Sequence, residues 1–356
     1  MYRILNLAAF VGGNGIRKVR SFTTDTRILT QRIPNALSYS RNVYILGSDA
    51  FQNEEKALEK SCSIPRRSPE LNDDDDIEYT HSLEVLPYQY DELQDYAIGI
   101  RPVDDSNTLK SNKKKQKKKP QMQPVYIDFA PPPDSKLGKR VGGKQQGNEM
   151  LLKAISAGKY TNENGGCSVF DLTAGFGQDS MILAGDRNIQ KLLMVERDEI
   201  VFLLLSDALR RLSLIANIDD RYIPLFQKLD LRKSDSIDFC TEVSSDESNL
   251  ERPDICYLDP MFPPRKKAAA VKKNMQILHG MFQTNESNAD DVERWRQERT
   301  LLDSALNLAK RRVVVKRPVN ADPLGVSSSM NNEQNSASLP SLQLKGSINR
   351  FDVYVI

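Results

Sequence analysis

Histidine and cysteine are scarce in this chain of 356 residues, which has two histidines, four cysteines and one tryptophan. With only His81 and His279 available, catalysis by a serine–histidine–aspartate triad is not expected. The cysteines have neither the CxxC spacing nor the neighbouring histidines of a zinc site, so we expect reduced, mostly buried thiols. The composition therefore predicts no metal centre and no disulfide framework.

An excess of one charge and a long hydrophobic run are also lacking. The 50 Lys and Arg residues against 48 Asp and Glu give a formal net charge of +2. This excludes a histone-like polycation but not a local patch that binds nucleic acid. No stretch approaches the roughly 18 apolar residues of a membrane-spanning helix, and we expect no membrane partner. A hydrophobic content of 39% is low for one compact unit, which predicts polar segments beside a normal core.

Acidic residues are absent from the first 24 positions, which carry four basic residues and end in Ser21-Phe22-Thr23-Thr24. This composition is typical of an organelle transit peptide, and the Arg20-Ser21-Phe22 step resembles a mitochondrial processing site. We expect residues 1–41 to be a transit peptide or an ordinary disordered N-terminus. A mitochondrion is favoured over a plastid, and a cytoplasmic location follows if the segment does not target the chain.

Residues 42–130 are expected to form a small N-terminal α+β subdomain. The pattern indicates one helix, at 51–60, and alternation typical of strands. These strands are expected at 43–46, 83–86, 97–100 and 125–129. A lysine-rich loop at 110–120 is either an RNA-tethering arm or a solvated insert.

Residues 131–356 alternate strands and helices, which predicts an α/β fold with a mostly parallel sheet covered by helices. Strands are expected at 168–172, 191–196, 222–226, 255–258 and 312–315, and helices at 178–184, 199–215 and 294–309. Polar stretches near 241–252, 284–291 and 325–338 are interpreted as surface insertions.

The first strand of this unit runs into a glycine turn, from Asp171 through Ala174, Gly175 and Gly177 to Gln178-Asp179. A strand, a glycine turn and a helix bring backbone N–H groups close to a bound ligand. The turn is not the GxGxxG dinucleotide fingerprint, and alone it is as compatible with a structural turn as with a cofactor loop.

Acidic residues after the next two strands favour the cofactor interpretation. Glu196, followed by Arg197, lies where a ribose hydroxyl pair needs an acceptor. Asp230, after Leu229, is either an acceptor for an adenine amino group or a helix N-cap. Together with Asp171, these acids suit the cationic S-adenosylmethionine better than a pyrophosphate cofactor.

A second motif, Asp259-Pro260-Met261-Phe262, follows the strand at 255–258. It resembles the (D/N)PP(Y/F/W) motif of methyltransferases that act on exocyclic amines, with Met261 at the third position. Asp259 and the Pro260 carbonyl are expected to accept the two N–H bonds of a base amino group, and Phe262 to stack on an extruded base. Catalysis would then rest mainly on positioning.

Basic residues gather after the candidate catalytic strand ends. Solvated helix faces are the default interpretation, but several runs at one edge would form a rim that binds phosphates. The expected RNA contacts are Arg265, Lys266, Lys267, Lys272, Lys273, Lys316 and Arg317.

Six strings together resemble the RsmJ family of small-subunit ribosomal RNA guanine-N2 methyltransferases. They are DLTAGFGQD, VER, YLDPMFP, AVKKNM, the segment 310–318 with its VVVKRP ending, and NRFDVY. The likeness spans about residues 42–356. It implies a Rossmann-like class I methyltransferase with a seven-stranded sheet, S-adenosylmethionine as the methyl donor, and a guanine in ribosomal RNA as the acceptor.

The resemblance also places cofactor contacts on particular residues. These are Gln178-Asp179, Glu196-Arg197, Leu229-Asp230 and Asp259. This chain has Gln178 where the family usually has arginine, and its segment 142–147 departs from the family's glycine-rich pattern.

The sequence thus predicts an organelle-directed enzyme that methylates a guanine N2 in small-subunit ribosomal RNA. Its expected partner is ribosomal RNA or the small subunit, without metal, and the enzyme is expected to be a monomer. Two alternatives stay open: an RNA-binding assembly factor without catalysis, and an enzyme of the same fold acting on DNA adenine or a protein amide.

Overall fold

The computed structural model describes residues 43–46, 50–62, 66–67, 81–103, 123–142, 146–160, 166–245, 249–260, 291–326 and 339–356. Within these ranges the chain forms two sheets, one of four strands and one of seven. No helix in them is long and apolar enough to cross a membrane. No cluster of histidine, cysteine, aspartate and glutamate in them could hold a metal ion.

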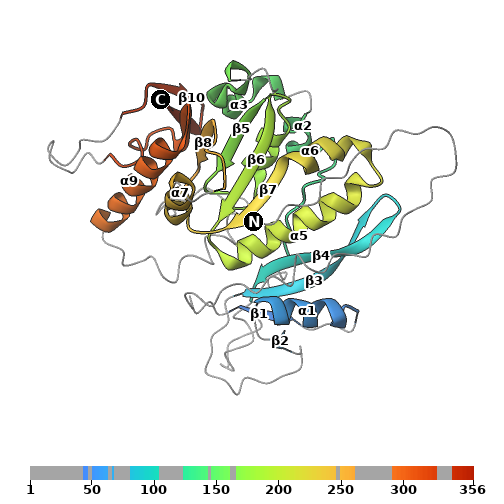
Figure 1. Cartoon of the computed structure of the whole chain (residues 1–356). Helices are drawn as coiled ribbons and strands as arrows, with labels where there is room; N and C mark the ends of the chain where they lie inside the picture. Colours follow the sequence, from blue (N-terminus) through green and yellow to red (C-terminus); the bar gives the residue numbers. More distant parts are fainter. Residues whose placement is uncertain are drawn as a thin grey trace, which may run out of the picture.

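The smaller sheet lies in the N-terminal part of the chain and has the order β2-β1-β3-β4 (Figure 1). Its elements are β1 (Val43–Leu46), α1 (Gln52–Cys62), β2 (Arg66–Arg67), β3 (His81–Tyr90) and β4 (Leu93–Pro102). β3 and β4 form an antiparallel hairpin, whereas β1 runs parallel to both β2 and β3. The helix and the first three strands expected from the sequence are therefore confirmed.

The fourth strand expected there, at 125–129, is wrong. Only Val125 joins the sheet, through a single antiparallel bridge to Ile100 with N–O distances of 2.8 and 2.9 Å. The chain then leaves the sheet, and Phe129 packs against the glycine turn, where a Cβ on Gly177 would lie 2.8 Å from its ring. Alternating apolar residues here reflect burial between two units rather than strand pairing.

A buried ionic network on α5 (Glu199–Ala216) fixes the small sheet to the larger unit. Asp207 accepts a hydrogen bond from the Ile98 amide of β4, at 2.9 Å, and pairs with Arg211 at 3.0 Å. Arg210 reaches Asp95 of β4 at 2.5 Å. Because unpaired buried charges are strongly destabilising, these contacts specify how the sheet docks.

The larger sheet has the order β10-β11-β9-β8-β5-β6-β7. All its strands run parallel except β11, which is antiparallel to both neighbours. The strands are β5 (Cys167–Asp171), β6 (Ile189–Glu196), β7 (Leu229–Lys233), β8 (Ile255–Leu258), β9 (Arg312–Pro318), β10 (Leu342–Lys345) and β11 (Asn349–Val355). The expected α/β fold with a mostly parallel seven-stranded sheet is confirmed.

Helices cover both faces of this sheet (Figure 1). Residues alternate between two apolar cores: Val169 and Val314 pack with α3, α4 and α5, while Phe170 and Val315 pack with α7 and α9. Because both faces are buried there, the central strands carry continuous apolar runs, at 255–258 in β8 and 313–315 in β9. The remaining helices and turns are α2 (Lys136–Arg140), η3 (Gln146–Asn148), α3 (Met150–Ile155), η4 (Ala157–Lys159), α4 (Gln178–Ala184), η5 (Asp220–Tyr222), α6 (Ile223–Lys228), α7 (Ser236–Ser244) and α9 (Asp291–Leu308).

Two expectations for this unit are wrong. Residues 222–226 form the end of η5 and the start of α6, with Pro224 in the first helical turn, and the strand begins only at Leu229. Proline is well suited to a first helical turn because its missing N–H is not needed there. Residues 241–244 close α7 and bury Val243, so the polar insertion expected from 241 does not begin there.

Candidate active site

Four acidic side chains meet at one edge of the large sheet, where the parallel strands have their carboxyl ends. Asp171 ends β5, Glu196 ends β6, and Asp259 directly follows β8. Asp179 reaches the same edge from the first turn of α4. In an open parallel sheet, ligands bind at this edge.

The glycine turn between β5 and α4 is fastened to its neighbours by backbone hydrogen bonds. The Ala174 amide donates to the Val195 carbonyl at 3.2 Å, and the Gly175 amide donates to the Glu196 carboxylate at 3.0 Å. Gly175 and Gly177 have φ values of +52° and +68°, a region that disfavours residues with a Cβ. The backbone path therefore favours glycine at both positions, and at Gly177 a Cβ would also lie 2.8 Å from the Phe129 ring.

Asp171 is enclosed beneath this turn, with 1% of its surface exposed. Its carboxylate accepts hydrogen bonds from the Ser180 hydroxyl at 2.5 Å and from the Thr173 amide at 3.1 Å. Burial raises the pKa of Asp171 to about 7, helped by the nearby Asp179 and Asp259 and opposed by the two hydrogen bonds. Through these two hydrogen bonds, Asp171 therefore holds the glycine turn and the start of α4 in place.

Lys316 of β9 lies between two of the acids. Its ammonium donates to Oδ2 of Asp179 and to Oδ2 of Asp259, each at 2.7 Å. The Tyr257 hydroxyl donates to the same Asp179 oxygen at 2.7 Å. The β8–β9 register ends at Leu258 opposite Val315, so Lys316 and Asp259 are the next residues on the two strands. Sheet register alone brings them together.

These contacts set the charges of the cluster. Burial acts to raise the pKa of Asp179, but the ion pair with Lys316 outweighs it and holds that pKa below its usual value. Burial acts to lower the pKa of Lys316, but Asp179 and Asp259 raise it above its ordinary value. Asp179 and Lys316 are therefore charged at neutral pH.

The pKa of Asp259 is shifted in the opposite direction from that of Asp179. Its backbone amide donates to the Thr173 hydroxyl at 2.6 Å. Burial raises its pKa to about 6, opposed by Lys316 and increased by Asp179. The carboxylate is therefore mostly ionised at neutral pH but loses its charge under mildly acidic conditions.

The residues at this edge fit S-adenosylmethionine. The edge carries four carboxyl groups, of which Lys316 pairs with Asp179 and Asp259, so the edge favours a cationic ligand over a polyphosphate. The tight turn leaves no Cβ at Gly175, where a ligand would approach the backbone; a Cβ built there meets only the Thr173 carbonyl oxygen, at 3.9 Å.

Comparison with known proteins agrees with this geometry. The profile of a family described as putative SAM-dependent methyltransferases matches residues 103–356. A curated relative from Pseudoalteromonas atlantica, named ribosomal RNA small subunit methyltransferase J, is 37% identical over 68% of this chain and 81% of its own length. One of the same name from Alteromonas mediterranea is 34% identical over 78% of this chain and 86% of its own length. The chain belongs to the methyltransferase J family of SAM-dependent methyltransferases.

A solved structure agrees at the level of the fold. A SAM-dependent methyltransferase from Neisseria gonorrhoeae matches with a TM-score of 0.54 and 21% identity, covering 88% of this chain and 95% of that one. The family resemblance drawn from the sequence motifs is confirmed. The protein is an enzyme, and S-adenosylmethionine is the methyl donor of this methyltransferase.

Of the cofactor residues expected from the sequence, most lie at the described edge of the methyltransferase. The Glu196 carboxylate is almost buried and also accepts from the Asp198 amide at 2.7 Å. Arg197 points outward, with 62% of its side chain exposed and Asp235 at 3.8 Å. Glu196 thus lies within the edge, and the Arg197 side chain lies on its exposed side, beside Asp235.

Leu229 and Asp230 do not lie at the carboxyl end of their strand, and the expected position is wrong. Asp230 is opposite Leu193, three residues before Lys233, where β7 ends level with Glu196. The residues at the edge are instead Ser234, whose amide donates to the Glu196 carbonyl at 3.1 Å, and Asp235, the N-cap of α7. Asp235 lies three residues before Asp238, a spacing of acidic residues that is typical of a helix start. This spacing is the sequence signal that could have located Asp235 at the edge.

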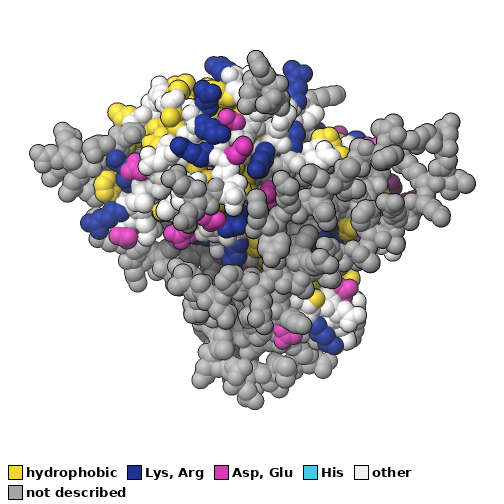
Figure 2. All heavy atoms as spheres, viewed as in Figure 1, with side chains coloured by type: hydrophobic (Ala, Val, Ile, Leu, Met, Phe, Trp, Pro, Cys, Tyr) yellow, Lys and Arg dark blue, Asp and Glu magenta, His cyan; other side chains and the backbone are white. Residues whose placement is uncertain are grey.

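Lys316 and Arg317 were expected on an exposed, RNA-facing rim, and the structure places them differently. Lys316 faces the acids, while Arg317 points to the opposite face of the sheet, where 6% of it is exposed and it donates to the Asp322 carbonyl at 2.9 Å. On the face in Figure 2, several basic side chains of the described residues gather in the upper part, with acidic side chains among and below them. Five expected RNA contacts, from Arg265 to Lys273, and Phe262 lie outside the described residues.

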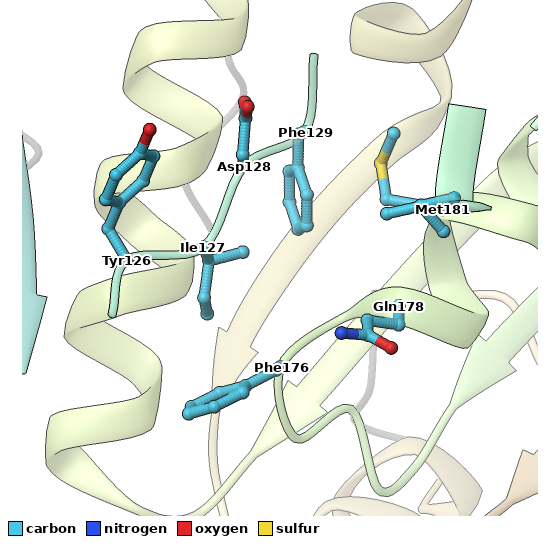
Figure 3. A pocket seen from close by; sticks show the side chains of 8 residues that line it. Tyr126, Ile127, Asp128, Phe129, Phe176, Gln178 and Met181 are labelled. Carbon is cyan, nitrogen blue, oxygen red and sulfur yellow. The ribbon is translucent and has the colours of Figure 1, made fainter. Parts of the chain in front are cut away.

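A cavity of about 40 Å³ adjoins the glycine turn (Figure 3). Its lining residues are Tyr126, Ile127, Asp128, Phe129, Leu137, Phe176, Gln178 and Met181. Ile127 and Phe129 point into this space and Gln178 borders it from the start of α4. A water molecule needs about 10–15 Å³ of such space, so the cavity holds a few waters but not a nucleoside.

Proposed function

We propose that this methyltransferase transfers a methyl group to the exocyclic N2 of a guanine in small-subunit ribosomal RNA. The names of its curated relatives support the RNA class. The DPMF loop supports an exocyclic amine as the acceptor. The observation that carries the proposal is the position of Asp259, a carboxylate at the cofactor edge directly after β8.

The chemistry requires orientation more than strong bases. The amino group of a nucleobase is a poor nucleophile because its lone pair is delocalised into the ring. Asp259 and the Pro260 carbonyl accept its two N–H bonds and turn the lone pair toward the donor. When bound, S-adenosylmethionine supplies an electrophilic methyl group on a sulfonium. Methylation of that nitrogen would release one of its protons, which the Asp259 carboxylate would accept.

An extruded base is needed because a paired guanine uses one N2–H bond in the base pair, so Asp259 and the Pro260 carbonyl can accept both N–H bonds only when the base is unpaired. Enzymes that modify bases bear this unstacking cost through contacts to the flanking nucleotides. The basic residues of the segment 265–273 support phosphate contacts next to Asp259 in sequence.

The decisive measurement is mass spectrometry of small-subunit RNA nucleosides from a deletion strain, with and without the restored gene. We expect N2-methylguanosine to be lost and regained. Purified enzyme should label RNA from the deletion strain, and Asp259→Ala should lower that rate at least about a hundredfold, as expected for a lost orienting group. A normal rate in the Asp259→Ala variant would refute this mechanism. If the deletion strain lost a methylated adenine or a methylated protein amide instead of N2-methylguanosine, the enzyme would have a different substrate.

Delivery to an organelle is a separate part of the proposal. Residues 1–24 support it by composition, being basic, hydroxylated and free of acid. A fluorescent protein fused to residues 1–41 should enter mitochondria. A matched fusion with Arg3, Arg17, Lys18 and Arg20 changed to glutamine should stay in the cytosol. Equal distribution of both fusions would refute mitochondrial targeting.

A further inference from the structure

Lys316 connects the two halves of the active site. Asp179 belongs to α4, which follows the glycine turn on the cofactor side, and Asp259 belongs to the loop that receives the acceptor. The Lys316 ammonium contacts both at 2.7 Å. Only 22% of its side chain is exposed. A lysine this enclosed and doubly paired is not available as a freely moving phosphate contact.

The pairing is selective for one oxygen of Asp259. Lys316 donates to Oδ2, and no residue that the structure describes donates to Oδ1. The Asp259 amide is held separately by Thr173. The carboxylate is therefore anchored at its backbone and at Oδ2, and among the described residues Oδ1 accepts no hydrogen bond.

Several charged groups of the described residues act on Asp259, by direct contact or at longer range. Lys316 and Arg317 of β9 favour its ionised form. Asp179 of α4 disfavours it, and Asp171 of β5 and Tyr257 of β8 belong to the same electrostatic cluster. Arg140 of α2 acts on Asp179 rather than directly on Asp259. Lys316 is the cation in direct contact.

We propose that Lys316 is a positioning residue that keeps the Asp259 carboxylate ionised and turned so that Oδ1 accepts an N–H bond of the target amino group. This inference rests on the proposed function, because it assigns the acceptor role to Asp259. It moves Lys316 from the RNA-binding rim to the interior of the site. The residue acts through Asp259 and touches neither the base nor the RNA backbone.

The first test is the pH profile of methyl transfer at saturating S-adenosylmethionine, for the wild type, Lys316→Met and Lys316→Arg. Losing an adjacent cation raises a carboxyl pKa by about one to three units. The acid limb of the Lys316→Met profile should therefore move to higher pH by at least about one unit. At pH 6.5 that variant should keep at most about a third of the wild-type kcat, with the gap narrowing by pH 9. Lys316→Arg should keep the wild-type limb.

Lys191→Met is the matched control. Lys191 is exposed near the amino end of β6, at the opposite edge of the same sheet, and the variant should match the wild type at every pH. An unshifted acid limb in Lys316→Met would overturn the inference. If the wild type itself transfers no methyl group to ribosomal RNA, the proposed function fails instead.

A second measurement does not depend on activity. With aspartate labelled by ¹³C at the carboxyl carbon, the Asp259 resonance is assigned by its loss in Asp259→Asn and titrated in each variant. Lys316→Met should raise the titration midpoint, whereas Asp179→Asn, which removes the competing carboxylate, should lower it. If Lys316→Met does not fold, the Asp179→Asn titration still decides. A midpoint that stays in place or rises in Asp179→Asn would refute the electrostatic arrangement.

Discussion

The hydroxyl of Thr173 accepts a hydrogen bond from the backbone amide of Asp259 at 2.6 Å, across 86 positions of the sequence. Thr173 belongs to the glycine turn, and Asp259 opens the DPMF loop. The contact joins the element that approaches the cofactor to the element that approaches the acceptor. One side chain thereby fixes the position of the DPMF loop relative to the glycine turn.

Thr173→Val should separate these two elements while keeping the shape of the side chain. We expect the free energy of unfolding to fall by about 1 kcal/mol, since one buried amide loses its acceptor. The kcat should fall about tenfold, because small displacements at a reacting centre are costly. Cofactor affinity measured by calorimetry should stay nearly constant. Thr173→Ser retains the hydroxyl and serves as the control, and equal kcat values for the two variants would contradict the role of this contact.

Asp171 should make the enzyme less stable as the pH rises. Its folded pKa, about 7, lies above the ordinary aspartate pKa of 3.8, so the native state binds more protons than the unfolded state between these values. Stability is then full below about pH 4 and is lost progressively up to about pH 7. Asp171→Asn removes this contribution, so its stability relative to the wild type should increase across that window. Urea unfolding at several pH values checks this, and a constant difference would refute it.

Gly177→Ala should be more damaging than its backbone conformation alone explains. Gly177 and Gly142 share a φ of +68°, but a Cβ on Gly177 would lie 2.8 Å from the Phe129 ring, whereas a Cβ on Gly142 meets nothing within 4 Å. Both alanine variants should lose about 1–2 kcal/mol from the left-handed backbone. Only Gly177→Ala should add a steric loss and weaken cofactor binding. Equal unfolding energies for the two variants would show that the ring moves aside freely.

Arg350→Met should destabilise the loop that follows Lys316. Arg350 is 4% exposed and pairs with the buried Asp352 at 2.7 Å. It also donates to the carbonyls of Val319 and Ala321 in that loop. Removing it leaves a buried charge without its partner, at a cost of about 3–5 kcal/mol. Urea unfolding should show this loss, whereas the exposed Arg187→Met should change stability by less than about 0.5 kcal/mol.

Sequence patterns predicted those elements well whose local signals agree with their tertiary role. The helix at 178–184 and the strand at 255–258 match the structure at both ends. The helix there directly follows Gly177, and the strand is a short buried apolar run before a proline. The errors arose where a run of apolar residues is buried for a reason other than strand pairing. Residues 222–226 are apolar because a helix packs there, and 125–129 because two units meet there.

The residues of the candidate site also fall into two groups, those that sequence motifs predicted and those that only the structure revealed. The glycine turn, Asp179, Glu196 and Asp259 follow from motifs, because each motif records a local backbone requirement beside a charged residue. Ser234 and Asp235 were missed because the strand before them was placed too early in the sequence. Thr173 and Tyr257 had no separate signal, since a single hydroxyl within a motif has no distinctive spacing.

The sequence by itself determined the fold class, the cofactor turn and the acceptor loop, because local geometry and residue chemistry specify these over a few positions. Only the tertiary structure decided what Lys316 and Arg317 do. Neighbours in sequence point to opposite faces of a strand, so one enters the acidic cluster and the other packs toward α9. Whether a basic residue meets solvent or a buried carboxylate depends on strand register, which pairs residues far apart in the chain.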